Sequence, residues 1–209
     1  KNIEVPSDLS SCAFFIVAAL INKNFKLFLK NININPTRDG ILKALLLMGG
    51  KIKILNKRKV NEEVVADLEV ESSELNGCEL GEDMSKLMID EYPILSIAAS
   101  FANSPSHFKG LKELRVKESD RLELIRHNLE NCGVKCLIKD DELFIYPKDK
   151  YTIKNNKIKT DFDHRIAMSF AIMGSLLEKD LFIDDSNSIK TSFPNFVECY
   201  NKVGGNIVE

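Results

Sequence analysis

The 209 residues carry 29 basic and 31 acidic side chains, a formal net charge of −2, and 44% of them are hydrophobic. This composition is typical of a globular protein and excludes a disordered chain, while the balanced charge provides no global field for nucleic acid. Because no apolar run reaches the roughly 18 residues needed to span a bilayer, we expect neither a membrane nor nucleic acid among the partners.

The five cysteines are odd in number and form no CxxC pair, which predicts free thiols and a cytoplasmic location. Cys132 and Cys136 flank the end of a predicted helix and the start of a predicted strand, so we expect small buried apolar side chains and no metal site. The chain begins at Lys1 rather than at a Met, and we expect it to be a fragment of a longer protein.

The first segment of the chain opens with Asp8, which precedes an apolar run and predicts a capped helix over 10–21. Its other elements are predicted from apolar and β-branched stretches and from Gly-containing helix ends. They are a strand over 26–29, a second helix from near Thr37 to Gly50, strands over 51–55 and 66–70, and a hairpin-type loop over 56–63.

Asp90 and Asp163 open two further segments in the same way, before apolar runs that predict helices over 92–102 and 164–177. The remaining predicted elements are second helices from near Ser119 to Gly133 and from near Ser192 to Gly205, and strands over 134–138, 143–146 and 181–183. Each segment thus repeats the order of the first.

The three segments share one period. Their opening aspartates are 82 and 73 residues apart, and their second helices start at the same spacings. The predicted unit is β-α-β-α-β-β, truncated in the third copy. Because one unit cannot cover a helix that is apolar on nearly all sides, we expect units of about 1–74, 75–149 and 150–209 to bury their first helices together. This predicts an α/β (α+β) fold with pseudo-threefold symmetry in one globular domain, 1–209.

Four of the six arginines lie at or just before a predicted helix start, where the helix dipole disfavours cations: Arg38, Arg115, Arg121 and Arg165. Lys117 and Arg121 are spaced i,i+4 and would share one helix face, so a bound anion would relieve their repulsion. Glu118 beside them is a candidate for proton transfer. The alternative is a surface helix in which Glu118 pairs with Arg121 and Ser119 or Asp120 caps the helix.

Arg165 follows Asp163 at another helix start, where its planar guanidinium suits a carboxylate or phosphate. A structural role best explains the neighbouring His164, and capping explains Asp90 and Glu91 before the helix over 92–102. If the three units close around an axis, these helix starts share one pole. The pole would then gather an acid/base site for a multi-anionic substrate from Asp90, Lys117, Glu118, Arg121 and Arg165.

Six stretches resemble successive motifs of the EPSP synthase family in both order and spacing. They are VPSD (5–8), NPTRDG (35–40), MIDEYP (88–93), LRVKESDRL (114–122), DHRIAM (163–168) and TSFP (191–194). The resemblance covers essentially the whole chain and is closest to the glyphosate-tolerant bacterial class. It implies the C-terminal half of a two-domain enzyme, with three β-α-β-α-β-β units and an active site in the cleft to an absent N-terminal half.

The resemblance also implies a reaction of the shikimate pathway, in which the enolpyruvyl group of phosphoenolpyruvate is transferred to the 5-hydroxyl of shikimate 3-phosphate. No metal or organic cofactor is implied. Asp90 would hold the shikimate hydroxyls and act as base, Lys117 would bind the shikimate side and help to move protons, and Glu118 would serve C3 of phosphoenolpyruvate. Glu113 stands where some family members have a substrate-binding Asn, so that contact is not expected here.

Phosphoenolpyruvate would be clamped by Arg121 and Arg165, with His164 nearby. Many family members have a Lys directly before the TFP or SFP tripeptide, but Thr191 holds that position here. Lys190, one residue earlier, is therefore a further candidate for phosphoenolpyruvate binding.

Because half a site should not turn over, we expect the chain to be inactive alone. Two alternatives stay open. One is half of an enolpyruvyl transferase that acts on a UDP-sugar, which shares the fold but should lack the KESDR string. The other is a non-catalytic module that binds an anion weakly or binds nothing.

Overall fold

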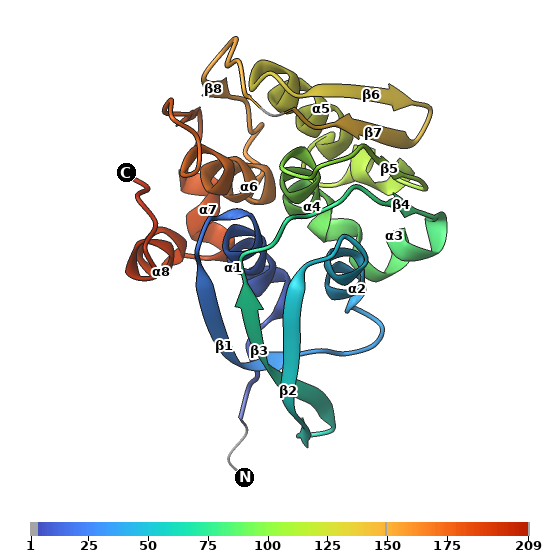
Figure 1. The fold of residues 1–209 in the computed structure, drawn as a ribbon, viewed down its shortest axis with the longest axis vertical. Coiled ribbons are helices and arrows are strands. Elements are labelled where there is room, and N and C mark those ends of the chain that lie inside the picture. The colour runs from blue at the N-terminus through green and yellow to red at the C-terminus, as the bar shows by residue number, and fades with distance from the viewer. Residues whose placement is uncertain (1–3, 149, 209) are drawn as a thin grey trace.

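The computed structural model describes residues 4–148 and 150–208, in which three small sheets surround a group of helices (Figure 1). Each sheet is formed by one consecutive part of the chain. The start of the chain at Lys1, used above to predict a fragment, lies outside the described residues.

The first unit begins with Asp8, whose carboxylate accepts a hydrogen bond of 2.8 Å from the Ser11 amide and caps the first helix. Its sheet has the order β1-β3-β2, with β3 antiparallel to both neighbours. A parallel bridge between Ser7 and Ile32 precedes the helix. The elements are α1 (Leu9–Ile21), β1 (Lys26–Asn33), α2 (Gly40–Leu47), β2 (Lys51–Val60) and β3 (Glu63–Glu71).

The second unit repeats this plan with additional short helices. Its sheet has the order β4-β5-β7-β6, with β4 parallel to β5 and β7 antiparallel to β5 and β6. The elements are β4 (Glu79–Leu80), α3 (Glu82–Met88), the 3-10 turn η1 (Ile89–Glu91), α4 (Tyr92–Ser100), β5 (Ser106–Phe108), the 3-10 turn η2 (Lys112–Val116), α5 (Arg121–Asn131), β6 (Lys135–Lys139) and β7 (Glu142–Tyr146).

The third unit is shorter and its two-stranded sheet is parallel. Its elements are β8 (Lys157–Ile158), α6 (His164–Gly174), β9 (Phe182–Ile183), α7 (Asn187–Ser192) and α8 (Phe196–Lys202). In all three units a short strand or bridge is parallel to the strand that follows the first helix. In the first two, a later strand then adds on the antiparallel side. The predicted repeat and its truncation in the third unit are therefore confirmed.

The first helices of the three units, α1, α4 and α6, contact one another in the middle of the molecule (Figure 1). Residues such as Ile16, Ile97 and Ile172 are fully buried there. This packing explains why α1 is apolar on nearly all sides, since protein surrounds it in every direction. Across residues 4–148 and 150–208, no helix combines the length and the apolarity required to cross a membrane.

The hairpin predicted over 56–63 is present, but its loop is shorter than predicted, because β2 and β3 extend through most of this stretch and pair as far as Val60 and Glu63. Asn61 and Glu62 form the turn with φ angles of 48° and 70°, the combination required by a type I′ turn. The charged residues before them suit a strand because this end of the hairpin extends away from the helices (Figure 1).

The predicted second helix of the third unit is also wrong in its bounds. Two short helices replace it, α7 ending at Ser192 and α8 starting at Phe196. Pro194 lies between them, where it has no amide hydrogen to continue a helix.

Replacing Phe14 with Ala should lower the free energy of unfolding by about 3–5 kcal/mol, because the side chain is 2% exposed and its removal leaves a cavity. Its ring centroid lies 5.9 Å from that of Phe196 in α8, so the loss would loosen the first unit from the third. Urea unfolding measures the change. Leu47→Ala, at a side chain 63% exposed, is the control and should change the free energy by less than about 0.5 kcal/mol. Equal losses in the two variants would contradict this packing.

Candidate active site

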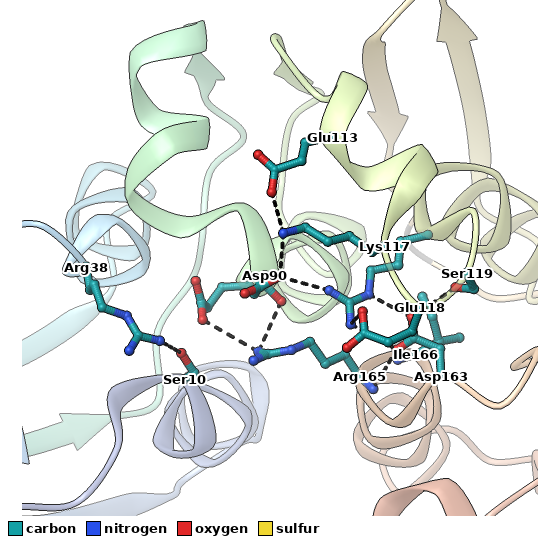
Figure 2. Close-up of polar contacts among 12 residues, drawn as sticks. Ser10, Arg38, Asp90, Glu113, Lys117, Glu118, Ser119, Asp163, Arg165 and Ile166 are labelled. Carbon is teal, nitrogen blue, oxygen red and sulfur yellow. Dashed lines mark hydrogen bonds and ion pairs between the residues drawn. The ribbon is translucent and has the colours of Figure 1, made fainter. Parts of the chain in front are cut away.

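A cluster of charged side chains lies at the N-terminal ends of α4, α5 and α6 (Figure 2). The turn η1 places Asp90 and Glu91 directly before α4, and η2 leads into the segment 117–120 before α5. The two turns contact each other, and η1 also contacts α1. Three helix starts therefore share one end of the domain, as the repeat predicted.

Arg121 is the centre of this cluster, and its side chain is fully buried. Its Nε donates to Asp163 at 2.7 Å and its Nη1 donates to Asp90 at 2.9 Å. Its Nη2 lies 2.6 Å from Glu118 and 3.4 Å from Asp163. Every nitrogen of the guanidinium thus has a carboxylate partner, which satisfies the rule that buried charges are paired. The protein's own carboxylates, rather than a bound anion, therefore balance the charge of Arg121.

Asp163 both caps α6 and pairs with Arg121. Its carboxylate accepts the amides of Arg165 at 2.9 Å and Ile166 at 3.4 Å, and also the Ser119 hydroxyl at 2.9 Å. Burial acts to raise the pKa of Asp163, but the hydrogen bond and the charge of Arg121 outweigh it, so the pKa is lowered. This carboxylate is therefore ionised and fixes two helix starts at once.

Asp90 lies among cations from three segments. Its Oδ1 lies 2.9 Å from Nη1 of Arg121 and 3.5 Å from Nζ of Lys117, and its backbone oxygen accepts a hydrogen bond of 3.3 Å from Arg165. Partial burial opposes ionisation, but the charges of Arg165, Lys117 and Arg121 outweigh it and lower the pKa of Asp90. The side chain is about one-third exposed, so a ligand can reach it.

The prediction that Lys117 and Arg121 share a helix face is wrong. Lys117 has an extended backbone, with φ −80° and ψ −153°, and α5 starts only at Arg121. Asp120 caps α5 by accepting the Glu123 amide at 3.0 Å, which ends the irregular segment. Lys117 instead forms ion pairs with Asp90 and Glu113, and the hydrogen bond to Glu113 is the main cause of its raised pKa. Lys117 and Arg121 nevertheless lie near each other, because both contact Oδ1 of Asp90.

Glu118 is the most accessible of the carboxylates around Arg121, with a side chain 49% exposed. It pairs with Arg121, and Asp120 caps the helix, so both contacts of the alternative surface-helix interpretation are present. Those contacts do not make the segment an ordinary surface helix, because its arginine is fully buried. Glu118 is therefore accessible to solvent while it is held by an ion pair with the buried Arg121.

His164 and Arg165 are the first residues of α6 and are both partly buried. Burial is the main cause that lowers the pKa of His164, and the adjacent charge of Arg165 acts in the same direction. Nη1 of Arg165 lies 3.6 Å from Glu91 in addition to its bond to the Asp90 backbone. Lys190 lies in the last turn of α7 and its side chain is exposed. Thr191 donates its hydroxyl to the Ser188 carbonyl at 2.7 Å.

The sequence analysis missed the tertiary ion pairs of two carboxylates, Glu91 and Asp163. The expectation that Asp90 and Glu91 cap α4 is wrong, because no side chain caps the start of that helix. Glu91 is instead 5% exposed and faces Arg165. Asp163 was expected only as a cap, and its pairing with Arg121 depends on tertiary contact between the second and third units. The placement of arginines at helix starts, where the dipole disfavours cations, was the available signal that negative partners lie nearby.

The described residues contain no group of three or more His, Cys, Asp or Glu side chains arranged to hold a metal ion. Cys132 and Cys136 are buried as expected, and burial raises the pKa of both thiols to about 12. Their thiolate forms, which metals require, are thus disfavoured. What the cluster offers is one reachable ionised carboxylate, a second exposed carboxylate and several cations, a set suited to proton transfer on an anionic ligand.

The family model for EPSP synthase (3-phosphoshikimate 1-carboxyvinyltransferase) matches residues 1–199. The chain is 46% identical to the 3-phosphoshikimate 1-carboxyvinyltransferase of Petrotoga mobilis, over 97% of this chain and 48% of the relative. It is 44% identical to the enzyme of the same name from Pseudomonas sp. strain PG2982, over 99% and 46%. The chain therefore spans about half the length of the curated relatives it matches.

Solved structures agree in fold. An EPSP synthase from Acinetobacter baumannii superimposes with a TM-score of 0.91 at 38% identity, over 97% of this chain and 47% of that one. The enolpyruvyl transferase NikO from Streptomyces tendae superimposes with a TM-score of 0.70 at 13% identity, a likeness of fold alone. The predicted fold class is confirmed by both.

Asp163→Asn should lower the free energy of unfolding at pH 7 by about 3–5 kcal/mol, because it leaves the buried Arg121 with an incomplete set of carboxylates. The folded-state pKa of Asp163 is lowered, so its stabilisation is complete above the unfolded value of about 3.9 and is lost as the pH falls through the folded value. The cost of the substitution should therefore shrink at acidic pH. Urea unfolding at several pH values measures it.

The matched control is Asp161→Asn, two residues away on an exposed side chain, which should change stability by less than about 0.5 kcal/mol. A cost for Asp163→Asn that stays constant from pH 7 to pH 3 would show that its charge is not what stabilises the cluster.

Proposed function

The chain belongs to the EPSP synthase family, and we propose that it supplies one half of the active site that transfers the enolpyruvyl group of phosphoenolpyruvate to the 5-hydroxyl of shikimate 3-phosphate. The products are 5-enolpyruvylshikimate 3-phosphate and phosphate, and the reaction belongs to the shikimate pathway of aromatic amino acid biosynthesis. The observation that supports the proposal most directly is the Asp90–Lys117–Glu118–Arg121–Arg165 cluster, which joins carboxylates to cations at one end of the domain.

The other half of the site would come from the remainder of the enzyme. Because the chain spans about half of its relatives, we propose that residues 1–209 form a single C-terminal domain of three units, about 1–74, 75–149 and 150–209. The end of the domain that carries the cluster would face an N-terminal half across a cleft. The free thiols of the described residues fit a cytoplasmic location.

The proposed chemistry adds O5 of shikimate 3-phosphate to C2 of phosphoenolpyruvate while C3 accepts a proton. Phosphate then leaves C2 as C3 gives up a proton, so atoms and charge balance. Asp90 would accept the proton of the 5-hydroxyl, and Glu118 would deliver and later remove the proton at C3. Both side chains are partly exposed, as proton donors and acceptors to a ligand must be.

The lowered pKa of Asp90 makes it a weak base before substrates bind. The charges of Arg165 and Lys117 are main causes of that lowering, and these are the same side chains that would bind substrate anions. A phosphate or carboxylate placed against them would cancel part of their effect on Asp90 and raise its pKa. Substrate binding would therefore strengthen the base at the moment it is needed.

Arg165 is the better placed of the two proposed phosphoenolpyruvate clamps. Arg121 is fully buried and each of its three nitrogens has a carboxylate partner, so a ligand would have to compete with these carboxylates for it. Lys117 would bind the shikimate side, His164 would lie beside the clamp, and Lys190 stays a further candidate for phosphoenolpyruvate. Neither a metal nor an organic cofactor has a part in this chemistry.

Phosphate release from phosphoenolpyruvate and shikimate 3-phosphate tests the proposal. We expect no release by this chain alone and release after it is combined with the other half of the enzyme. Glu118→Gln should then lower kcat about 10²–10⁴-fold, since it removes the proton-transferring carboxylate without changing its size. Glu198→Gln, on the exposed face of α8, is the matched control and should leave kcat unchanged.

Three outcomes would contradict the proposal. Release by the chain alone would show that the site is complete within it. Release only when a UDP-sugar replaces shikimate 3-phosphate would favour the related class of enolpyruvyl transferase. A properly folded combination of both halves that releases no phosphate would leave a module that binds anions at most.

A further inference from the structure

Glu91 is a buried carboxylate whose position local structure does not explain. It occupies the N-cap position of α4, yet its side chain makes no capping hydrogen bond. At 5% exposure it is the least exposed carboxylate side chain in the described sequence apart from Asp163. A carboxyl group so far from water keeps its charge only if partners favour the ionised form, and otherwise takes up a proton.

The partners of Glu91 come from three other parts of the fold. Nη1 of Arg165, at the start of α6, lies 3.6 Å from its Oε1. The hydroxyl of Ser10 on α1 is close enough to favour the ionised form of the carboxyl group. Nη2 of Arg38, just before α2, donates to that hydroxyl at 3.2 Å (Figure 2). Oε1 itself accepts no hydrogen bond within residues 4–148 and 150–208, so its contact with Arg165 is purely ionic.

These contacts determine how Arg165 is held. Its Nη1 is fixed on one side by the Glu91 carboxylate and by the backbone oxygen of Asp90. Its Nε and Nη2 donate no hydrogen bond to the described part of the chain. Those two nitrogens form the edge of a guanidinium that matches a carboxylate or phosphate with two parallel hydrogen bonds.

We propose that Glu91 is a positioning residue for phosphoenolpyruvate: by holding Nη1 of Arg165, it keeps the Nε and Nη2 edge of that guanidinium oriented for the anionic substrate. The inference rests on the proposed function. A long side chain held in its binding geometry before the ligand arrives loses less conformational entropy on binding, so the contribution is to affinity rather than to the chemical step.

The neighbours of Glu91 determine the direction in which its pKa is shifted. Burial is the main cause that raises its pKa, and the neighbouring Asp90 adds to it, while Ser10, Arg165 and Arg38 oppose it. Above that pKa the carboxylate holds Arg165. As the pH falls through it, the carboxyl group takes up a proton and the ionic contact is lost.

The test uses the full-length enzyme that contains this chain, with Glu91→Gln compared to wild type. We expect the KM for phosphoenolpyruvate to rise about tenfold near pH 8, the loss expected when one partner of a charged contact is removed. We expect kcat and the KM for shikimate 3-phosphate to change less than about twofold, since the reacting groups are untouched. The ratio of variant to wild-type KM for phosphoenolpyruvate should fall towards one as the pH is lowered, because wild-type Glu91 is then protonated as well.

Two further variants separate positioning from a general effect on the fold. Ser10→Ala removes the hydroxyl that favours the ionised form of Glu91 and accepts the hydrogen bond from Arg38. It should raise the KM for phosphoenolpyruvate by a smaller factor than Glu91→Gln, and it places no buried amide at position 91. Glu198→Gln is the matched control at an exposed carboxylate and should change neither kcat nor the KM for phosphoenolpyruvate.

The outcomes are distinct. A wild-type enzyme that releases no phosphate would overturn the proposed function and this inference with it. An active wild type with a Glu91→Gln variant whose KM for phosphoenolpyruvate is unchanged at every pH would overturn the inference alone. A loss of kcat that does not vary with pH, with KM unchanged, would assign Glu91 a structural role and would also overturn it.

Discussion

The guanidinium of Arg121 is fully buried and remains charged, and the free-energy cost of burying it governs how this end of the domain is built. Removing such a charge from water costs several kcal/mol unless carboxylates surround it in good geometry. Asp163 from α6, Asp90 from η1 and Glu118 from the segment before α5 meet that need. A lysine has no planar fork to serve three partners, so the residue type is as constrained as the position.

Several features of the site follow from this one arginine. Asp163 is committed to Arg121 and to the start of α6, so it is a structural carboxylate, whereas Asp90 and Glu118 keep one side open to solvent. Within the described part of the chain, the cations of the cluster already have protein partners, apart from the Nε and Nη2 edge of Arg165, so the proposed substrate anion would meet that edge first and would compete with carboxylates elsewhere. In the proposed enzyme, an anion bound against these cations would raise the pKa of Asp90, and the ordering of Arg165 by Glu91 would contribute to affinity.

The sequence predicted what depends on local chemistry. The caps at Asp8 and Asp163 were found because an aspartate before an apolar run satisfies nearby amides. The period between units followed from the same landmarks, and with it the meeting of the helix starts. The position of Lys117 was missed because the cap at Asp120 delays α5, and the burial of Glu91 was missed because it requires α1 and α6. The bend at Asn61 and Glu62 carries no glycine to mark it.

A double-mutant cycle between Arg121→Gln and Asp163→Asn, read by urea unfolding, tests most directly whether a shared buried ion pair joins the second and third units. The account predicts a coupling free energy of roughly 2–3 kcal/mol, because the two side chains satisfy each other and either substitution alone strands the partner. Costs that add to within about 0.5 kcal/mol would contradict it and would mean that apolar packing alone holds the helix starts together.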